Sequence, residues 1–263
     1  MGRKALFFDV DGTLFSETLR IVPESAKKAI IETRKKGNLV FINSGRVVSN
    51  LGPVMKLVES DGCLCGCGTY VRIGEEEVYC HRIPHDRGIQ VKKAIIRYDF
   101  DGVLEGIENC YFQKAESRIP KVRELKGYMK EGGHLSPYGW DDDCYEFDKF
   151  CVVADDRSDR EGLFAFLEPD FQVIDRGDDF YECVPKGHTK ATAIELVLNR
   201  LGMGLDDAWV FGDSSNDLDM FRYARNAVLM GKHDKVLEPY ATFVTSTVEE
   251  DGIEYAMKNL GLL

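Results

Sequence analysis

The chain has 263 residues, 30% of them charged and 44% hydrophobic, which is typical of a soluble globular protein long enough for one large domain or two modest ones. Its net charge of −11 argues against nucleic acid and anionic membranes as partners, because both require basic patches. No apolar run approaches the roughly 20 residues that cross a bilayer, and no cleavable signal precedes the first apolar run, so we expect a cytoplasmic location.

The first predicted strand is the apolar run 5–8, and Asp9-Val10-Asp11-Gly12-Thr13 follows it directly. A short run of this kind indicates a buried parallel strand, whose carboxyl end is the edge where open α/β sheets bind ligands. Asp9 and Asp11 are two residues apart on an extended segment and therefore face the same side, where a divalent cation would relieve their repulsion. Gly12 and Thr13 predict a turn with free backbone N–H groups, which suits an anion. A turn rich in aspartate that binds no ligand is the alternative.

The next elements along the chain also alternate between helix and strand. Pro23 and Gly37 bound a helical pattern, and the apolar run 39–42 predicts a second strand that ends at Asn43-Ser44-Gly45-Arg46. A helix is expected around residues 47–58, and residues 63–71 favour β structure. This alternation predicts an α/β sheet.

Three of the eight cysteines, Cys63, Cys65 and Cys67, form a CxCxC run. Tetrahedral zinc sites usually draw on CxxC spacing, and no second pair with a matching histidine occurs nearby. We therefore interpret the run as small apolar side chains on a strand, with a metal site as the minor alternative. The other cysteines are expected to be reduced thiols, many of them buried, because a chain of this size does not need disulfides for stability.

Residues 81–185 differ in pattern and predict an inserted α+β domain. Helices are expected over 86–98 and 159–167, and strands over 102–107, 147–154, 171–174 and 180–184. Within this segment, Trp140-Asp141-Asp142-Asp143 is interpreted as an exposed acidic turn, with contact to a polyol as the alternative.

The alternation resumes after Lys186-Gly187. We expect a helix over 189–201, a strand over 208–211 that ends at Gly212-Asp213-Ser214-Ser215-Asn216-Asp217, short strands over 227–230 and 242–244, and a final helix over 249–260. The predicted fold class is α/β: a Rossmann-like parallel-sheet core from residues 1–80 and 186–263, into which residues 81–185 are inserted.

Polar loops follow three of the predicted parallel strands, and they begin at Asp9, Asn43 and Asp213. The carboxyl ends of parallel strands meet at one edge of a sheet, so these loops should converge. Lys190, on the helix after Lys186-Gly187, adds a cation. Carboxylates, a hydroxyl and a lysine together match what phosphoryl transfer requires, which is in-line positioning, neutralised oxygens and a hard cation.

These four segments resemble the four signature motifs of the haloacid dehalogenase superfamily, in the family's order and over essentially the whole chain. The long segment between Arg46 and Lys190 has room for a cap and resembles the class IIB cap of the Cof-type sugar-phosphatase group. The short segment between Asp11 and Ser44 has no such room. The inserted domain, 81–185, is therefore expected to be the substrate-specificity cap.

The resemblance implies a catalytic role for each acidic residue. Asp9 would be the nucleophile that forms an aspartyl-phosphate, and Asp11 would be the general acid and then the base that activates water. Mg²⁺ would be held by the Asp9 carboxylate, the Asp11 backbone carbonyl and the Asp213 carboxylate. Asp217 would support the metal and the lysine.

The resemblance also implies the residues that bind substrate. Ser44 and the Gly45 N–H would hold a phosphate oxygen, and Lys190 would offset charge and orient Asp9, with Lys186 as the nearest competitor. Gly12 and Asn216 are expected at the substrate site. Arg46 is either a substrate contact or part of a structural salt bridge. Cys67-Gly68-Thr69 stands where many relatives carry Asn-Gly-Ala, so a substrate contact of those relatives is missing here.

The sequence therefore predicts a Mg²⁺-dependent phosphatase of small phosphorylated metabolites, with sugar phosphates as the leading class. A phosphomutase of the same superfamily is the first alternative, because the four motifs do not distinguish water from a second hydroxyl as acceptor. A non-catalytic protein that binds phosphorylated metabolites is the second alternative. The physiological substrate and the oligomeric state stay open.

Overall fold

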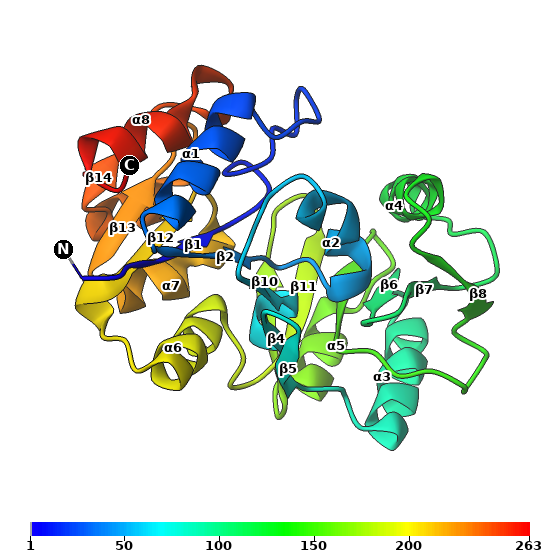
Figure 1. Ribbon diagram of the computed structural model, residues 1–263. Helices are drawn as coiled ribbons and strands as arrows, with labels where there is room; N and C mark the ends of the chain where they lie inside the picture. The colour runs from blue at the N-terminus through cyan, green and yellow to red at the C-terminus, as the bar shows by residue number, and fades with distance from the viewer. Residues whose placement is uncertain (1) are drawn as a thin grey trace. The chain divides into compact units, whose positions relative to one another are not determined.

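The computed structural model describes residues 2–263 and divides into two compact units (Figure 1). The first unit contains residues 2–45, 51–80 and 189–263, and the second contains residues 46–50 and 81–188. Residues 46–50 and 186–188, expected in the core, thus group with the second unit. The reason is local packing: Val47 belongs to an apolar cluster of the second unit, and the His188 ring lies 4.3 Å from the His81 ring.

The first unit is built on an eight-stranded sheet with the order β14-β13-β12-β1-β2-β3-β4-β5. Its strands from β14 to β3 are parallel, and β4 and β5 extend it as antiparallel strands. This arrangement confirms the predicted Rossmann-like core. The strands are β1 (Ala5–Phe8), β2 (Leu39–Asn43), β3 (Gly62–Cys65), β4 (Tyr70–Ile73), β5 (Glu76–Cys80), β12 (Ala208–Gly212), β13 (Asn226–Leu229) and β14 (Phe243–Val244).

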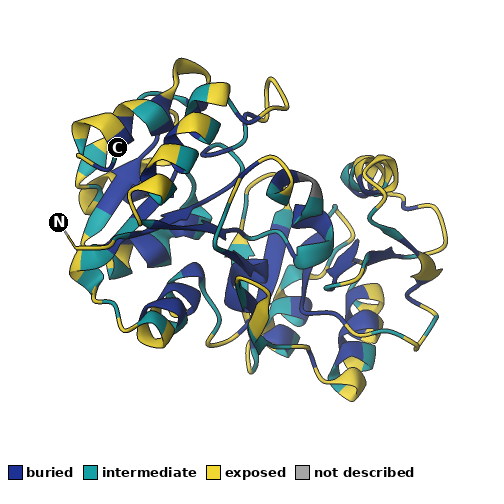
Figure 2. Ribbon diagram, in the orientation of Figure 1, coloured by how far each residue is buried: buried dark blue, intermediate teal, exposed yellow. Residues whose placement is uncertain are grey.

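Helices cover both faces of this sheet (Figure 1). Helices α6 (Lys190–Leu201) and α7 (Leu218–Tyr223) pack on the face that carries Phe7, Phe41 and Val210. Helices α1 (Glu24–Lys35) and α8 (Gly252–Asn259) lie together on the other face. The central strands β1, β2, β3 and β12 are buried and the outer helix faces are exposed (Figure 2), as expected for parallel strands with continuous apolar sequences.

The order of the strands determines where a ligand can bind. The chain leaves β1 toward β2 on one side, whereas β12 continues toward β13 on the other side. The sheet therefore reverses its direction of winding between β1 and β12, and in open α/β sheets the crevice at this switch point is the usual ligand site. Asp9 follows β1 and Asp213 follows β12.

The end of the chain differs from the expected single helix over 249–260. A 3-10 turn over Val248–Glu250 comes first, and α8 begins only at Gly252. Asp251 separates them with a left-handed φ of 58°. Gly252 is required there because a Cβ atom would lie 2.2 Å from the Ser246 carbonyl oxygen.

The second unit has a six-stranded sheet with the order β10-β11-β9-β6-β7-β8, antiparallel except for β7 and β8. Helices α3 (His85–Arg97) and α5 (Arg160–Leu167) cover one face, and α4 (Pro120–Glu131) packs on the other. Helix α2 (Val48–Met55) connects residues of the two units. The strands are β6 (Asp101–Glu105), β7 (Cys110–Phe112), β8 (Leu135–Gly139), β9 (Lys149–Val153), β10 (Phe171–Asp175) and β11 (Phe180–Pro185).

The sequence analysis missed helix α4, although it located α3 and α5. Half of the residues of α4 are charged, it contains Gly127, and it buries only Val122 and Met129, so its apolar periodicity is weak. The prediction of an exposed acidic turn after β8 holds for Asp143 but not for Trp140. Trp140 is buried and its indole N–H donates to the Tyr111 carbonyl oxygen over 3.0 Å, whereas Asp143 is exposed and pairs with Lys92.

All eight cysteines lie among residues 2–263 and are free thiols. Cys63 and Cys65 are buried on β3, and Cys67 is buried in the following turn with a φ of 55°. Within residues 2–263, no helix has the length and apolar character that crossing a membrane would require.

A buried group of charges ties three strands of the second unit together. The Lys149 ammonium on β9 lies 2.7 Å from Glu105 on β6 and 2.6 Å from Glu182 on β11, and all three side chains are at most 7% exposed. The Cys151 thiol donates to Glu105 over 3.3 Å. The lysine therefore compensates two carboxylates that the sheet removes from water.

We expect Lys149→Met to destabilise the protein by about 3–5 kcal/mol, because it leaves two buried carboxylates without a cation. Lys121→Met is the matched control: Lys121 lies 3.9 Å from Asp178, whose side chain is 96% exposed, and such pairs contribute about 0–1 kcal/mol. Urea denaturation measures both free energies of unfolding. Equal losses in the two variants would contradict this account of the buried group.

Candidate active site

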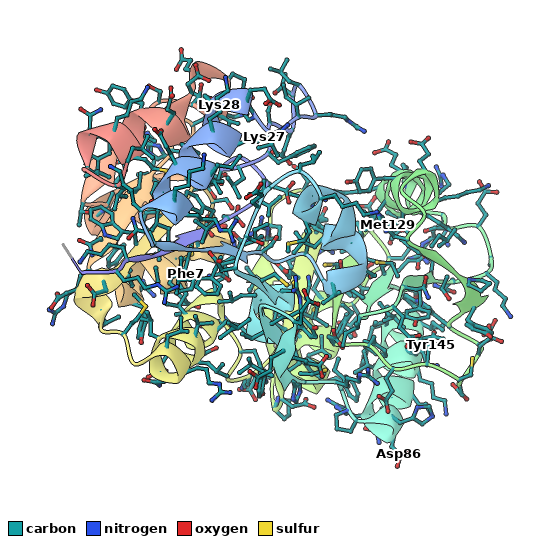
Figure 3. The ribbon with its side chains drawn as sticks, viewed as in Figure 1. Phe7, Lys27, Lys28, Asp86, Met129 and Tyr145 are labelled. Atoms are coloured by element: carbon teal, nitrogen blue, oxygen red, sulfur yellow. The ribbon has the colours of Figure 1, made fainter. Side chains whose placement is uncertain are left out.

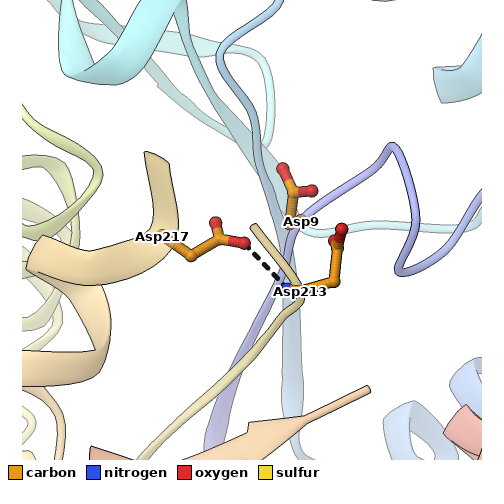
Figure 4. A group of neighbouring side chains, drawn as sticks. All are labelled: Asp9, Asp213 and Asp217. Carbon is orange, nitrogen blue, oxygen red and sulfur yellow. Dashed lines mark hydrogen bonds between the residues drawn. The ribbon is translucent and has the colours of Figure 1, made fainter. Parts of the chain in front are cut away.

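Three carboxylates converge at the switch point of the first unit. Asp9 after β1, Asp213 after β12, and Asp217 in the 3-10 turn Ser215–Asp217 each offer a carboxylate oxygen within 4.8 Å of the other two (Figure 4). Asp9 and Asp217 are buried, and Asp213 is half-buried. The sequence analysis named all three residues, and the fold brings them together.

Lys190 lies between two of these carboxylates. Its ammonium is 2.5 Å from Asp9 Oδ1 and 2.6 Å from Asp217 Oδ1, and its side chain is completely buried. Lys190 is the first residue of α6, a position where the helix dipole disfavours a cation. The two carboxylates must therefore supply the energy that holds the ammonium there.

Asp217 is fully engaged by hydrogen bonds. Its Oδ1 accepts from Lys190, and its Oδ2 accepts from the backbone N–H groups of Asp213 and Ser214 over 2.9 and 3.1 Å (Figure 4). Both oxygens of this carboxylate are thus already used by the protein. This geometry suits a residue that positions Asp213 and Lys190.

The turn after Asp9 corrects one prediction. The N–H groups of Gly12 and Thr13, expected to be free for an anion, donate to the carbonyl oxygens of Phe15 and Val10 over 3.0 and 3.2 Å. Gly12 instead makes room for a neighbour: its φ is 81°, and a Cβ atom there would lie 2.3 Å from Asp213 Oδ2. The Thr13 hydroxyl donates to Asp213 Oδ1 over 2.8 Å.

Burial of like charges shifts the acid–base behaviour of the group. Burial raises the pKa of Asp9 to about 7, against the opposing effect of Lys190 and with a further rise from Asp217 and Asp11. Burial, together with Asp9 and Asp217, raises the pKa of Asp213 to about 8. Burial opposes the charge of Lys190, but Asp217 and Asp9 outweigh it and hold the pKa of Lys190 above its usual range.

The donor set fits a hard divalent cation. Three carboxylates and one ammonium carry a net charge of −2 when all are ionised, which one divalent cation neutralises. Carboxylate oxygens are the ligands that Mg²⁺ prefers in proteins. Burial is the main cause of the raised pKa values of Asp9 and Asp213, and repulsion between the neighbouring carboxylates adds to it, so a bound cation would favour their ionised forms.

The remaining predicted residues lie as follows. Asp11 is half-buried and close enough to Asp9 to raise its pKa. Ser44 is buried directly after β2, and its backbone N–H donates to the Leu64 carbonyl oxygen over 2.8 Å; Gly45 follows it and is half-buried. The side chain of Asn216, also half-buried, accepts a hydrogen bond from the Ser214 hydroxyl over 2.9 Å.

Two residues expected near the site belong to the second unit. The Arg46 guanidinium donates to the Tyr128 hydroxyl over 3.4 Å. The Lys186 ammonium pairs with Glu168 over 3.0 Å and is 48% exposed. Of the two candidate lysines, only Lys190 is therefore bonded to Asp9 and Asp217.

The sequence analysis gave no role to Asn43 or to the Thr13 side chain. Asn43 is fully buried at the end of β2, and its amide donates to the Lys190 carbonyl oxygen over 3.1 Å, so it positions the first turn of α6. In the sequence, the signal that could have identified Asn43 is its position as a polar residue at the end of an apolar strand. The hydroxyl of Thr13 had no signal, because its partner Asp213 is 200 residues away.

Comparison with known proteins gives consistent matches over the whole chain. The sequence profile of haloacid dehalogenase-like hydrolases matches residues 6–257. The chain is 30% identical to "Putative phosphatase YkrA" of Bacillus subtilis, over 100% of both chains. It is 36% identical to a phosphoglycolate phosphatase of Archaeoglobus fulgidus, over 99% of this chain and 98% of the relative. A solved HAD subclass IIB sugar phosphatase superposes with a TM-score of 0.82 at 26% identity, over 99% of this chain and 100% of that one.

Proposed function

Because the chain belongs to the haloacid dehalogenase-like hydrolase family, we propose that it hydrolyses phosphate monoesters of small metabolites at the Asp9–Asp213–Asp217 group with the aid of Mg²⁺. Its phosphatase relatives identify it as a phosphoric monoester hydrolase. The observation that carries the proposal is the buried contact of Lys190 with Asp9 beside the half-buried Asp213. This contact fixes the orientation of Asp9 as the carboxylate nucleophile. The negative charge of Asp213 beside it would be offset by a divalent cation.

In the proposed reaction, a carboxylate oxygen of Asp9 attacks phosphorus while the bond from phosphorus to the leaving oxygen breaks. Asp11 donates a proton to that oxygen, so the product leaves as an alcohol and an aspartyl-phosphate is formed on Asp9. Water then attacks the same phosphorus, Asp11 takes its proton, and the Asp9 carboxylate and inorganic phosphate are released.

The other residues hold the reacting groups in place. Lys190 fixes the orientation of Asp9 and offsets charge on the transferring group, and the Ser44 hydroxyl with the Gly45 N–H binds a phosphate oxygen. The Asp9 and Asp213 carboxylates and the Asp11 carbonyl would hold Mg²⁺. When bound, the ion supplies positive charge to the phosphoryl oxygens. Asp217 acts through hydrogen bonds to its neighbours, since both of its oxygens are engaged.

For the substrate, we propose a small phosphorylated metabolite and place sugar phosphates first. The sugar phosphatase among the structural neighbours and the phosphoglycolate phosphatase among the relatives support this class. We also propose that the second unit acts as a cap that selects the leaving group, since such units exclude water and recognise substrate in enzymes that close over their sites.

The test is a panel of phosphorylated metabolites, assayed for phosphate release with and without Mg²⁺. We expect release that requires Mg²⁺, strongest for one chemical class. Transfer of phosphate between two hydroxyls without release, detected by ³¹P NMR, would instead identify a mutase. Binding of the compounds without any turnover would identify a non-catalytic protein, and either result would overturn the proposal.

Mg²⁺ should also stabilise the fold, because it binds carboxylates that converge only in the folded chain. At a concentration 100 times its Kd, the expected gain is about 2.7 kcal/mol. Thermal denaturation with and without Mg²⁺ measures it. Asp213→Asn should abolish this gain, whereas Asp219→Asn, on α7 and outside the carboxylate group, should retain it. An unchanged gain in Asp213→Asn would place the ion elsewhere.

A further inference from the structure

The second unit contains a pocket of about 350 Å³ that the proposed reaction does not use. It is formed by the start of α3, the turn between β6 and β7, and the segment that leads into β9. Its size is at the lower end of the range of small-molecule sites. All residues that line it belong to the second unit.

The pocket is acidic, and two of its four carboxylates lack an ion pair. Asp143 lies 2.7 Å from the Lys92 ammonium, and Glu146 lies 3.3 Å from the Arg82 guanidinium. Glu108 and Asp148 form no salt bridge with any residue in the range 2–263. No cation of the described residues therefore lies within ion-pair distance of these two carboxylates.

Asp148 provides an observation independent of the net charge. Asp148 is only 1% exposed, yet its Oδ2 atom has no hydrogen-bond partner among the described residues. An unpaired buried oxygen costs the free energy of removing it from water. Burial raises the pKa of Asp148 to about 7; Arg82 and Lys149 lower this pKa, whereas Glu105 and Glu146 raise it.

Aromatic rings form part of the wall. The rings of Tyr111 and Tyr145 stack with centroids 3.7 Å apart and an angle of 5° between their planes. Tyr145 lies beside α3 (Figure 3), and the ammonium of Lys92 on that helix is 5.1 Å from the centre of the Tyr145 ring. The wall therefore already accommodates one ammonium against an aromatic ring and a carboxylate.

These features favour an organic cation over a bare metal ion. Among residues 2–263, the only group of three or more carboxylates, histidines or cysteines that converges closely enough to hold a metal is that of the active site. We propose that the pocket binds a small molecule with a primary ammonium or guanidinium group, held by Asp148 and Glu108. The ligand is a separate amine rather than the phosphate monoester, since every residue that lines the pocket belongs to the second unit and none to the carboxylate group of the first.

Isothermal titration of the full chain with 1,4-diaminobutane, without Mg²⁺, tests the site. We expect binding of the diamine and none of the neutral 1,4-butanediol. Asp148→Asn and Glu108→Gln should each weaken binding roughly tenfold or more, because each removes a charge-assisted hydrogen bond. Asp141→Asn, in the same segment but outside the pocket, is the matched control. Equal binding of diamine and diol, or equal affinity of all variants, would overturn the proposal.

A second readout separates charge pairing from a structural effect of the substitution. Binding of a cation should drive ionisation of Asp148, so titrations at pH 7 in buffers of different ionisation enthalpy should reveal proton release that Asp148→Asn lacks. His85 also lines the pocket, and His85→Gln should keep most of this release. If Asp148→Asn does not fold, Glu108→Gln and the neutral diol still decide the question.

Hydrolysis of O-phosphoethanolamine and of ethylene glycol monophosphate tests the proposed function separately. Because the pocket holds a separate amine, Asp148→Asn should change kcat/KM for the two esters equally. A loss confined to O-phosphoethanolamine would overturn the assignment to a separate amine. Diamine binding without hydrolysis of any ester would retain this site and reject the proposed function.

Discussion

Asp9→Asn should reduce phosphate release by on the order of 10⁴-fold or more, because an amide cannot act as the carboxylate nucleophile. The variant should fold at least as well as the wild type. It removes one of three neighbouring carboxylates that repel one another, and Lys190 retains its 2.6 Å contact with Asp217. Steady-state assays of phosphate release and urea denaturation measure the two effects.

Asp219→Asn is the control for this experiment, since it makes the same chemical change outside the carboxylate group. Trapping of a phosphorylated chain by acid quench should succeed for the wild type and fail for Asp9→Asn. Steady-state hydrolysis that survived in Asp9→Asn would exclude Asp9 as the nucleophile, and the reaction would then need a water attack without a covalent intermediate.

Lys190→Met should lose both activity and stability. It leaves Asp9 and Asp217 buried without a cation, and loss of one partner from such a group costs about 3–5 kcal/mol. Loss of a preorganised charge at the transferring group should remove a further ~3 kcal/mol of transition-state stabilisation. Denaturation curves and kcat/KM measure these quantities separately.

Lys186→Met is the matched control, because Lys186 is half-exposed and pairs with Glu168, which should contribute no more than about 1 kcal/mol. A second variant separates charge balance from catalysis. Lys190→Met combined with Asp217→Asn should recover much of the stability but not the turnover. A greater loss of activity in Lys186→Met than in Lys190→Met would show that Lys186, and not Lys190, has the catalytic role.

The same physical feature distinguishes the active site and the pocket of the second unit. In each, a carboxylate that the fold removes from water lies near further carboxylates, and burial, together with them, raises its pKa: Asp213 in one and Asp148 in the other. The buried Lys149 group is the contrasting case. There, hydrogen bonds engage both glutamates, so we assign it to stability.

Local sequence was sufficient for the architecture of the core and for its acidic residues. A short apolar run that ends in carboxylates has few alternatives to a buried parallel strand, and the ends of such strands must meet at one edge. Asp9, Asp213 and Asp217 were therefore predictable before the fold was known. The helical pattern missed α4, which buries few residues, and α7, which at six residues is too short to show a helical period.

Only the tertiary structure decided how these residues act on one another. The Lys190 ammonium meets Asp9 across 181 positions of sequence, and this contact is what separates Lys190 from Lys186. The tertiary structure also shows that the Gly12 and Thr13 N–H groups donate hydrogen bonds within the turn, and that one oxygen of Asp148 has no hydrogen-bond partner among the described residues. Hydrogen-bond partners and burial depend on distances between distant segments, and those distances exist only once the sheets have formed.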